Sequence, residues 1–240
     1  MALPQPFLDH LREKGYHPRS DKHSNALSDA VIADLVSACP AIGERAVRGE
    51  LVYVRNFDLY HQQSDWNNDL VIGPPPLGSV KPLQDDEGSM RYAEPNIVQI
   101  AIEHKAVMTE HRKAVKNRRR DLSAYHEHVH RYSNDCIAAG TVVVNISESF
   151  QSPLRDDLTI HKNVTGLVQH CLNELRGVPV RQGTSGEGLD ALCVLIVSMT
   201  NVDPNDTEWR TAAPAPSVGD PLHYDGLVQA VCSGYETRFC

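Results

Sequence analysis

The first part of the chain changes from a helical to a strand-like hydrophobic period. Apolar side chains recur every three or four positions over residues 27–38, which predicts a helix that Pro40 ends. A short helix is expected next, over residues 42–48. Segments rich in β-branched and aromatic residues then predict strands over residues 51–55 and 69–72, the second stopped by glycine and proline.

A stretch rich in proline and glycine, residues 73–95, separates these strands from a second series of elements. Residues 97–107 are expected to form a strand, residues 109–132 a long helix and residues 137–146 a buried strand. The helix carries one apolar stripe, made of Val115, Leu122, Tyr125, Val129 and Tyr132. The stretch before the strand is long for a compact domain, which favours a functional or disordered loop.

The second half of the chain repeats the alternation of helix and strand. Residues 160–175 have a clear helical pattern that Gly177 ends. Residues 192–197 are almost all apolar, which is typical of a central strand covered on both faces. Residues 227–231 are expected to form one more strand. This order of elements predicts the α/β class, with a mixed central sheet flanked by helices.

The domain organisation predicted from the sequence is simple. Residues 1–25 are polar and irregular and are expected to be a lead-in. Residues 26–240 are expected to form a single domain, since no internal repeat or linker divides them. Within it, residues 26–146 form the core, and residues 147–240 extend the sheet and supply possible recognition elements.

The charge distribution changes the picture that the net charge of −8 gives. Residues 105–131 contain eight basic and three acidic side chains, a local charge of +5, so the rest of the chain carries −13. A basic stripe on an acidic body is what a polyanion-binding face requires. The alternative interpretation is a solvated helix face with no ligand.

Cysteines and the N-terminus indicate the compartment. The six cysteines show no C-x-x-C spacing, which argues against a zinc ribbon and a redox motif. Cys171 and Cys193 lie in apolar patterns and are expected to be buried hydrophobes. No basic segment followed by an apolar core marks a secretory signal, and no apolar run approaches the roughly 20 residues that span a bilayer. We therefore expect a cytoplasmic protein without a membrane partner.

The strand over residues 97–107 carries the main candidate chemistry. Side chains alternate between the faces of a strand, so Gln99, Ala101, Glu103 and Lys105 are expected on one face and mostly apolar residues on the other. Glu103 and Lys105 would lie about 7 Å apart by strand rise. A carboxylate binds a hard divalent cation, and a lysine stabilises developing charge or helps to activate water.

Asp69 is the best candidate for a second carboxylate. It begins a short strand that we expect to pair beside residues 97–107 across the long loop. Asp69 and Glu103 would then converge on one ion. That ion would polarise a phosphate and lower the pKa of its bound water.

This pattern resembles the PD-(D/E)xK nuclease superfamily, which includes most type II restriction endonucleases. Its signature is an acidic residue on one strand, then Glu or Asp, one residue and Lys on the next. Here these are Asp69 and Glu103-His104-Lys105. The family core of helix, three strands, helix and strand also matches the order of elements from Leu27 to Ile146.

The resemblance implies a restriction-endonuclease-like core and a DNA endonuclease of restriction type. Its cofactor would be Mg²⁺, held by Asp69 and Glu103, with Lys105 completing the catalytic set. It would hydrolyse phosphodiester bonds in double-stranded DNA, most simply as a homodimer. The DNA backbone would be contacted from the long helix by Arg112, Lys116, Arg119 and Arg120. Base readout would come from the loop at 73–95 and from residues beyond 200.

The chain departs from the family pattern at two points. Asn68 replaces the usual proline, and 34 residues separate Asp69 from Glu103. The first acid therefore has alternatives in an acidic loop cluster, Asp85, Asp86 and Glu87. Possible accessory groups are Gln99 on the active face and, from the first helical region, Glu44 or Glu50.

Rival interpretations stay open at this stage. One is a nuclease of the same fold that acts in repair, or in phage defence against modified DNA. Another is a catalytically silent DNA-binding or subunit-interface protein that keeps the fold. A further alternative is that Glu103 and Lys105 form only a solvated salt bridge on an exposed strand, worth about 0–1 kcal/mol.

Histidines offer a competing metal site. His126 and His130 are one helical turn apart, a spacing that can bind zinc, although no matching cysteines accompany them. His104 is expected to be a hydrogen-bonded core residue, and His111 has a weaker claim to approach a phosphate.

Overall fold

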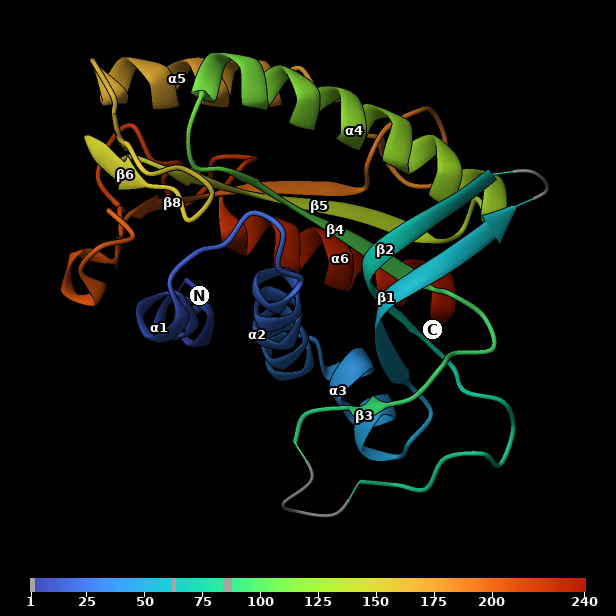
Figure 1. Cartoon of the computed structure of the whole chain (residues 1–240). Helices are drawn as coiled ribbons and strands as arrows, with labels where there is room; N and C mark the ends of the chain where they lie inside the picture. The colour runs from blue at the N-terminus through green and yellow to red at the C-terminus, as the bar shows by residue number, and fades with distance from the viewer. Residues whose placement is uncertain (1–2, 62–63, 84–87) are drawn as a thin grey trace.

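Seven strands form one mixed sheet that separates two layers of helices (Figure 1). The computed structural model describes residues 3–61, 64–83 and 88–240. The strands of the sheet are β1 (Val52–His61), β2 (Ser64–Gly73), β3 (Arg91–Tyr92), β4 (Ile100–Val107), β5 (Ile137–Asn145), β8 (Ala191–Ser198) and β9 (Glu208–Trp209). They lie in the order β3-β1-β2-β4-β5-β8-β9.

The direction of the strands changes at β4. Strands β1, β2 and β4 are antiparallel neighbours, whereas β4, β5 and β8 run parallel. Parallel neighbours require a crossover, which α4 (His111–Tyr132) and α5 (Val164–Leu175) supply. Strand β4 pairs with β5 along its whole length but with β2 only over its first three residues. The second half of β4 therefore has a strand neighbour on one side only, within the part of the chain described.

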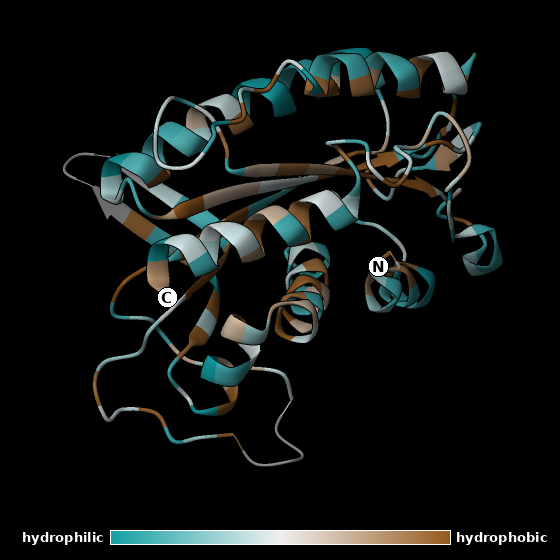
Figure 2. Ribbon diagram, turned by 180° about the vertical axis from the view of Figure 1, so that it is seen from behind, coloured by the Kyte–Doolittle hydropathy of each residue, from teal (hydrophilic) through white to brown (hydrophobic). Residues whose placement is uncertain are grey.

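The helices cover both faces of the sheet. Helices α4 and α5 lie on one face (Figure 1). The other face is covered by α1 (Gln5–Lys14), α2 (Lys22–Ala38), α3 (Pro40–Val47) and α6 (Tyr224–Phe239). Figure 2 shows hydrophobic residues along the sheet and hydrophilic residues along much of α4. A two-stranded sheet of β6 (Ser149–Gln151) and β7 (Leu158–Ile160) and the short helix η1 (Pro204–Asp206) complete the described elements.

The side chains of the buried strands point alternately to the two faces of the sheet, so both helical layers pack against apolar residues. In β8, Cys193 and Leu195 pack toward the layer of α1, α2, α3 and α6, whereas Val194 and Ile196 pack toward α4 and α5. Nearly every residue of this strand is buried. The almost unbroken apolar run therefore supplies side chains to two cores at once, which confirms the expectation of a strand covered on both faces. The strand is not central, because only the two-residue β9 lies beyond it. The predicted class, α/β with a mixed sheet flanked by helices, is also confirmed.

The N-terminal lead-in was predicted wrongly. Residues 5–14 form α1, which buries Phe7, Leu8 and Leu11, and α2 begins at Lys22. Three apolar residues among polar neighbours are enough to hold this helix in place, because α1 packs on α2. The segment expected to be irregular is thus part of the fold.

The C-terminal strand was also predicted wrongly. Residues 227–231 lie within α6. Four residues are buried at helical spacing, Leu227, Val228, Val231 and Tyr235. This helical period becomes visible only over a segment longer than the five residues that suggested a strand.

In the described part of the chain, no single helix is long and apolar enough to cross a membrane; α2 and α3 pass that test only together, across a bend of 105°.

A buried carboxylate joins the elements at one end of the sheet. Asp190, at the start of β8, accepts hydrogen bonds from Arg181 at 3.1 Å, Arg238 at 2.5 Å, His130 at 3.3 Å and the backbone N–H of Ala138 at 2.8 Å. Burial opposes ionisation, but these hydrogen bonds hold the pKa of Asp190 well below its usual range. The group links α4, β5 and α6.

We expect Asp190→Ala to destabilise the protein by about 3–5 kcal/mol, because it leaves buried guanidinium groups unpaired. Chemical denaturation at neutral pH measures the change in free energy of unfolding. Asp156→Ala, at an exposed position, serves as the control and should change it by less than about 0.5 kcal/mol. Equal stability of the two variants would contradict the role given to Asp190.

Candidate functional site

The site forms where the pairing of β2 with β4 ends. The last paired residues are Leu70 and Ile102. At the next position the carboxylate of Asp69 accepts a hydrogen bond from the backbone N–H of His104 at 2.7 Å. The expected pairing of the two strands is confirmed. This bond fixes the Asp69 carboxylate against β4 beside Glu103.

Glu103 is a buried carboxylate, with 3% of its surface exposed. One oxygen forms an ion pair with the ammonium of Lys105, and the other accepts a hydrogen bond from Trp66 Nε1 at 3.4 Å. The Trp66 ring packs on Tyr125 of α4, with 5.8 Å between ring centroids. Glu103 therefore lies in an aromatic environment beneath α4, and the alternative of a fully solvated salt bridge is wrong.

The ionisation of Glu103 reflects this environment. Burial raises its pKa to about 7, the charge of Lys105 lowers it, and the nearby charge of Asp69 raises it further. Lys105 thus offsets only part of the cost of burying the carboxylate. A second cation at this point would favour the charged form.

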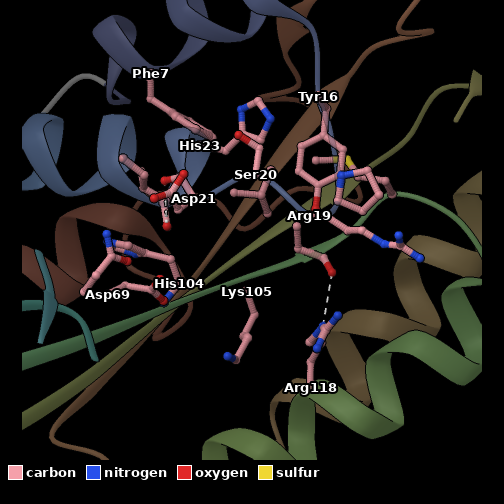
Figure 3. A pocket seen from close by; sticks show the side chains of 17 residues that line it. Phe7, Tyr16, Arg19, Ser20, Asp21, His23, Asp69, His104, Lys105 and Arg118 are labelled. Carbon is pink, nitrogen blue, oxygen red and sulfur yellow. Dashed lines mark hydrogen bonds between the residues drawn. The ribbon is translucent and has the colours of Figure 1, made fainter. Parts of the chain in front are cut away.

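A cavity of about 340 Å³ lies beside Lys105 and Asp69. Figure 3 shows Lys105 and Arg118 on one side of it, and Tyr16, Ser20, Asp21 and His23 on the other. The second group comes from the segment between α1 and α2 and from the start of α2. This segment occupies the side of β4 that β2 leaves unpaired.

Arg118 is the cation of α4 that reaches the cavity. Its Nε donates to the backbone carbonyl of Ala106 at 3.3 Å, and its Nη1 donates to Asp121 at 3.1 Å. Sequence reasoning counted Arg118 in the basic stripe but did not select it. Arg118 lies four residues before the buried Leu122, so the helical period places it on the sheet-facing side of α4. This spacing is the sequence signal that could have identified it.

The selected DNA-binding side chains lie elsewhere on α4. Arg112, Lys116 and Arg120 are exposed. Arg119 forms an ion pair with Glu174 of α5 at 3.0 Å. None of the four lines the cavity, so any contact they make with a polyanion lies outside it.

The structure does not bring the accessory candidates to the site. The Gln99 side chain accepts a hydrogen bond from Tyr235 of α6 at 3.4 Å, in the opposite helical layer from Trp66 and Tyr125. A bend at Gln99, before β4 begins, breaks the alternation that predicted a shared face. Glu44 and Glu50 both pair with Arg48 at the end of α3. The alternative acids Asp85, Asp86 and Glu87 lie outside the described residues.

His104 is a structural residue, as expected. Its Nε2 lies 3.0 Å from Ser28 Oγ and its Nδ1 lies 2.7 Å from Thr141 Oγ1. Burial lowers its pKa to about 4, so the ring is neutral at physiological pH. His104 joins α2 to β5 through β4 and fixes the backbone between Glu103 and Lys105.

The other histidines considered from the sequence, His111, His126 and His130, lie away from the cavity. His111 is buried and bonds the backbone carbonyl of Asn145 at 2.7 Å, so its expected approach to a phosphate is wrong. The rings of His126 and His130 are 6.1 Å apart, and His130 bonds Asp190. No third ligand atom joins this pair in the described part of the chain.

Two cysteines that sequence reasoning left apart meet in the fold. Cys39, at the junction of α2 and α3, forms a disulfide with Cys232 of α6, and Glu236 lies beside it. Their separation of 193 positions leaves no local motif. Cys171 and Cys193 are free and buried, which confirms their expected role as small hydrophobes.

Comparisons of the chain with protein-family models, with curated proteins and with solved structures found no match. The interpretation of the site therefore rests on its own geometry.

The raised pKa of Glu103 gives a test of the site's electrostatics. Because the folded state keeps the Glu103 carboxyl protonated up to about pH 7, metal-free protein should lose stability as pH rises from about 4.5 to 7. Glu103→Gln should remove this part of the pH dependence, a difference of about 3 kcal/mol at most, since one pKa unit corresponds to about 1.4 kcal/mol. Urea unfolding in EDTA at both ends of the range measures it. Parallel pH profiles for wild type and variant would show that Glu103 titrates normally.

Proposed function

We propose that the protein is a magnesium-dependent nuclease that hydrolyses phosphodiester bonds in DNA. The observation that supports this most directly is the meeting of Asp69, Glu103 and Lys105, of which Asp69 and Lys105 line one cavity and Glu103 pairs with Lys105. Two carboxylates suit a hard divalent cation, and an ammonium suits a phosphate.

The order of elements supports the same proposal. Helix α2, strands β1, β2 and β4, helix α4 and strand β5 follow each other as in the PD-(D/E)xK core, with the short helix α3 and the two-residue β3 inserted. The first acid stands on β2, and the Glu-x-Lys group stands on its antiparallel neighbour β4. We therefore interpret this part of the sheet as a restriction-endonuclease-like core.

The residues present fit a divalent cation. Asp69 presents a carboxylate held by a backbone N–H, and Glu103 is a buried carboxylate whose charge Lys105 only partly compensates. Asp69 and Glu103 would hold the ion. When bound, Mg²⁺ supplies Lewis-acid polarisation of the phosphate and a lowered pKa for its water.

Residues of the chain would bind the phosphate, exclude water and position the carboxylate of Asp69. Lys105, with 19% of its side chain exposed, stands at the cavity wall and places a positive charge next to an entering phosphate. Trp66 and Tyr125 exclude water from the Glu103 side, which strengthens each charge interaction there. The bond from His104 N–H fixes the angle of Asp69.

The homodimer and the cytoplasmic location remain predictions.

Removing any one of the three groups tests the proposal. We expect Asp69→Asn, Glu103→Gln and Lys105→Ala each to reduce Mg²⁺-dependent cleavage by at least about a hundredfold, the scale of losing one stabilising group. Agarose-gel assays on plasmid and genomic DNA, methylated and unmethylated, with Mg²⁺ or EDTA, measure this. Glu50→Gln, which removes an exposed acid paired with Arg48, is the matched control and should cut like wild type.

Wild-type rates in Lys105→Ala would refute the assignment of the active site. A wild-type protein that binds DNA and cuts neither these substrates nor single-stranded DNA would instead support the catalytically silent alternative. Cutting confined to modified DNA would indicate a defence nuclease of the same fold.

The basic face of α4 allows a second test. Replacing the exposed Arg112 or Lys116 by alanine should weaken binding about equally for all DNA sequences, because these side chains would contact phosphates. Each change should also flatten the slope of log affinity against log salt by roughly one unit. Arg119→Ala should have a smaller effect, since Arg119 is paired with Glu174. An unchanged salt slope in all three variants would exclude a role for this face.

A further inference from the structure

The cavity beside Lys105 is closed on one side by the N-terminal segment. Tyr16, Ser20, Asp21 and His23 line it opposite Lys105 (Figure 3). The volume of about 340 Å³ lies at the lower end of the range for small-molecule pockets, about 300–1,000 Å³. Asp69 and Lys105 therefore line a pocket of nucleotide scale.

The two halves of this pocket differ in chemistry. One half carries the cations Lys105 and Arg118. The other half carries rings, with Tyr16 and His23 stacked at 4.9 Å between centroids and 24° between ring planes, and Phe7 beside them. Polar and charged side chains, Arg19, Ser20 and Asp21, line this half as well. Cations suit a phosphate, and rings suit a nucleobase.

Tyr16 is held firmly in the wall. Its backbone N–H donates to Asn201 Oδ1 at 2.6 Å, and its carbonyl accepts from Asn201 Nδ2 at 3.0 Å. Gly15 allows this approach, since it has a φ of 64° and a Cβ there would lie 2.9 Å from the same Asn201 oxygen. The ring is thus positioned before any ligand arrives.

His23 contributes a neutral ring to this wall. Burial lowers its pKa to about 4, and its Nε2 accepts a hydrogen bond from His17 N–H at 2.8 Å. Burial raises the pKa of Tyr16, and the charge of Arg118, on the opposite side of the pocket, lowers it. A base on the aromatic wall and its phosphate at Lys105 and Arg118 therefore lie within one pocket.

We propose that this pocket binds one unstacked nucleotide, so that the substrate is DNA that is single-stranded at the site of cleavage. The inference rests on the proposed function and specifies its substrate. A base in a duplex reaches the aromatic wall only after leaving its stack, which costs a few kcal/mol, and an unpaired strand avoids most of that cost. This substrate differs from the intact duplex that the sequence suggested.

The test compares a fluorescein-labelled single strand with its duplex in EDTA, by fluorescence anisotropy at fixed salt. We expect the wild-type protein to bind the single strand at least about tenfold more tightly. Tyr16→Leu should lower single-strand affinity by about tenfold or more, and Tyr16→Phe should retain it, since base stacking needs only the ring. Tyr92→Ala, which removes a 58% exposed ring outside the pocket, is the control and should have no effect.

A spectroscopic measurement separates stacking from misfolding. A strand carrying 2-aminopurine should lose fluorescence on binding to wild type and to Tyr16→Phe, and lose less on binding to Tyr16→Leu. Thermal melting of each variant by circular dichroism checks the fold. The proposal is overturned if the wild-type protein binds duplex as tightly as single strand or more tightly. It is also overturned if folded Tyr16→Leu quenches 2-aminopurine as much as wild type does.

Cleavage distinguishes this failure from failure of the proposed function. If Mg²⁺ supports cutting of duplex faster than of single strands, and Tyr16→Leu cuts normally, the nuclease stands and the single-strand inference is wrong. If nothing is cut but single-strand preference and quenching persist, the pocket inference stands and the nuclease proposal is wrong.

Discussion

Burial of the Glu103 carboxylate is the constraint on which the account of this protein depends. Taking an ionised carboxylate out of water costs several kcal/mol unless charges or hydrogen bonds compensate. Lys105 and Trp66 Nε1 provide part of that compensation, yet the pKa of Glu103 still rises to about 7. The charge of a second carboxylate, Asp69, also acts on Glu103, and we propose that a divalent cation bound between the two would be stabilising.

The sheet builds this place by an incomplete strand pairing. Strand β2 pairs with β4 only from Leu70 onward, and the Asp69 side chain, just before it, accepts a hydrogen bond from the backbone N–H of His104 in β4. The second half of β4 then borders the segment between α1 and α2, not another strand. The change from antiparallel to parallel neighbours at β4 thus yields both the carboxylate pair and the pocket beside it.

The sequence predicted much of this fold and site, for identifiable reasons. Long periodic segments, such as those of α4 and β8, specify their elements because period and burial agree. The pairing of the strand that carries Asp69 with that of Glu103 followed from an expected hairpin across the loop, although the strand begins at Ser64 and not at Asp69. The helix α1 and the disulfide from Cys39 escaped prediction because contacts with segments distant in the chain determine them. Gln99 was misplaced because a local bend breaks the alternation of faces.

Mn²⁺ bound to crystals of the protein would test the central claim most directly, because its anomalous scattering locates the ion without reference to any activity. The account predicts one anomalous peak bridging the carboxylates of Asp69 and Glu103, about 2.0–2.2 Å from an oxygen of each, with Lys105 displaced from its ion pair with Glu103. No peak at this position at saturating Mn²⁺, with the Glu103–Lys105 ion pair intact, would contradict it.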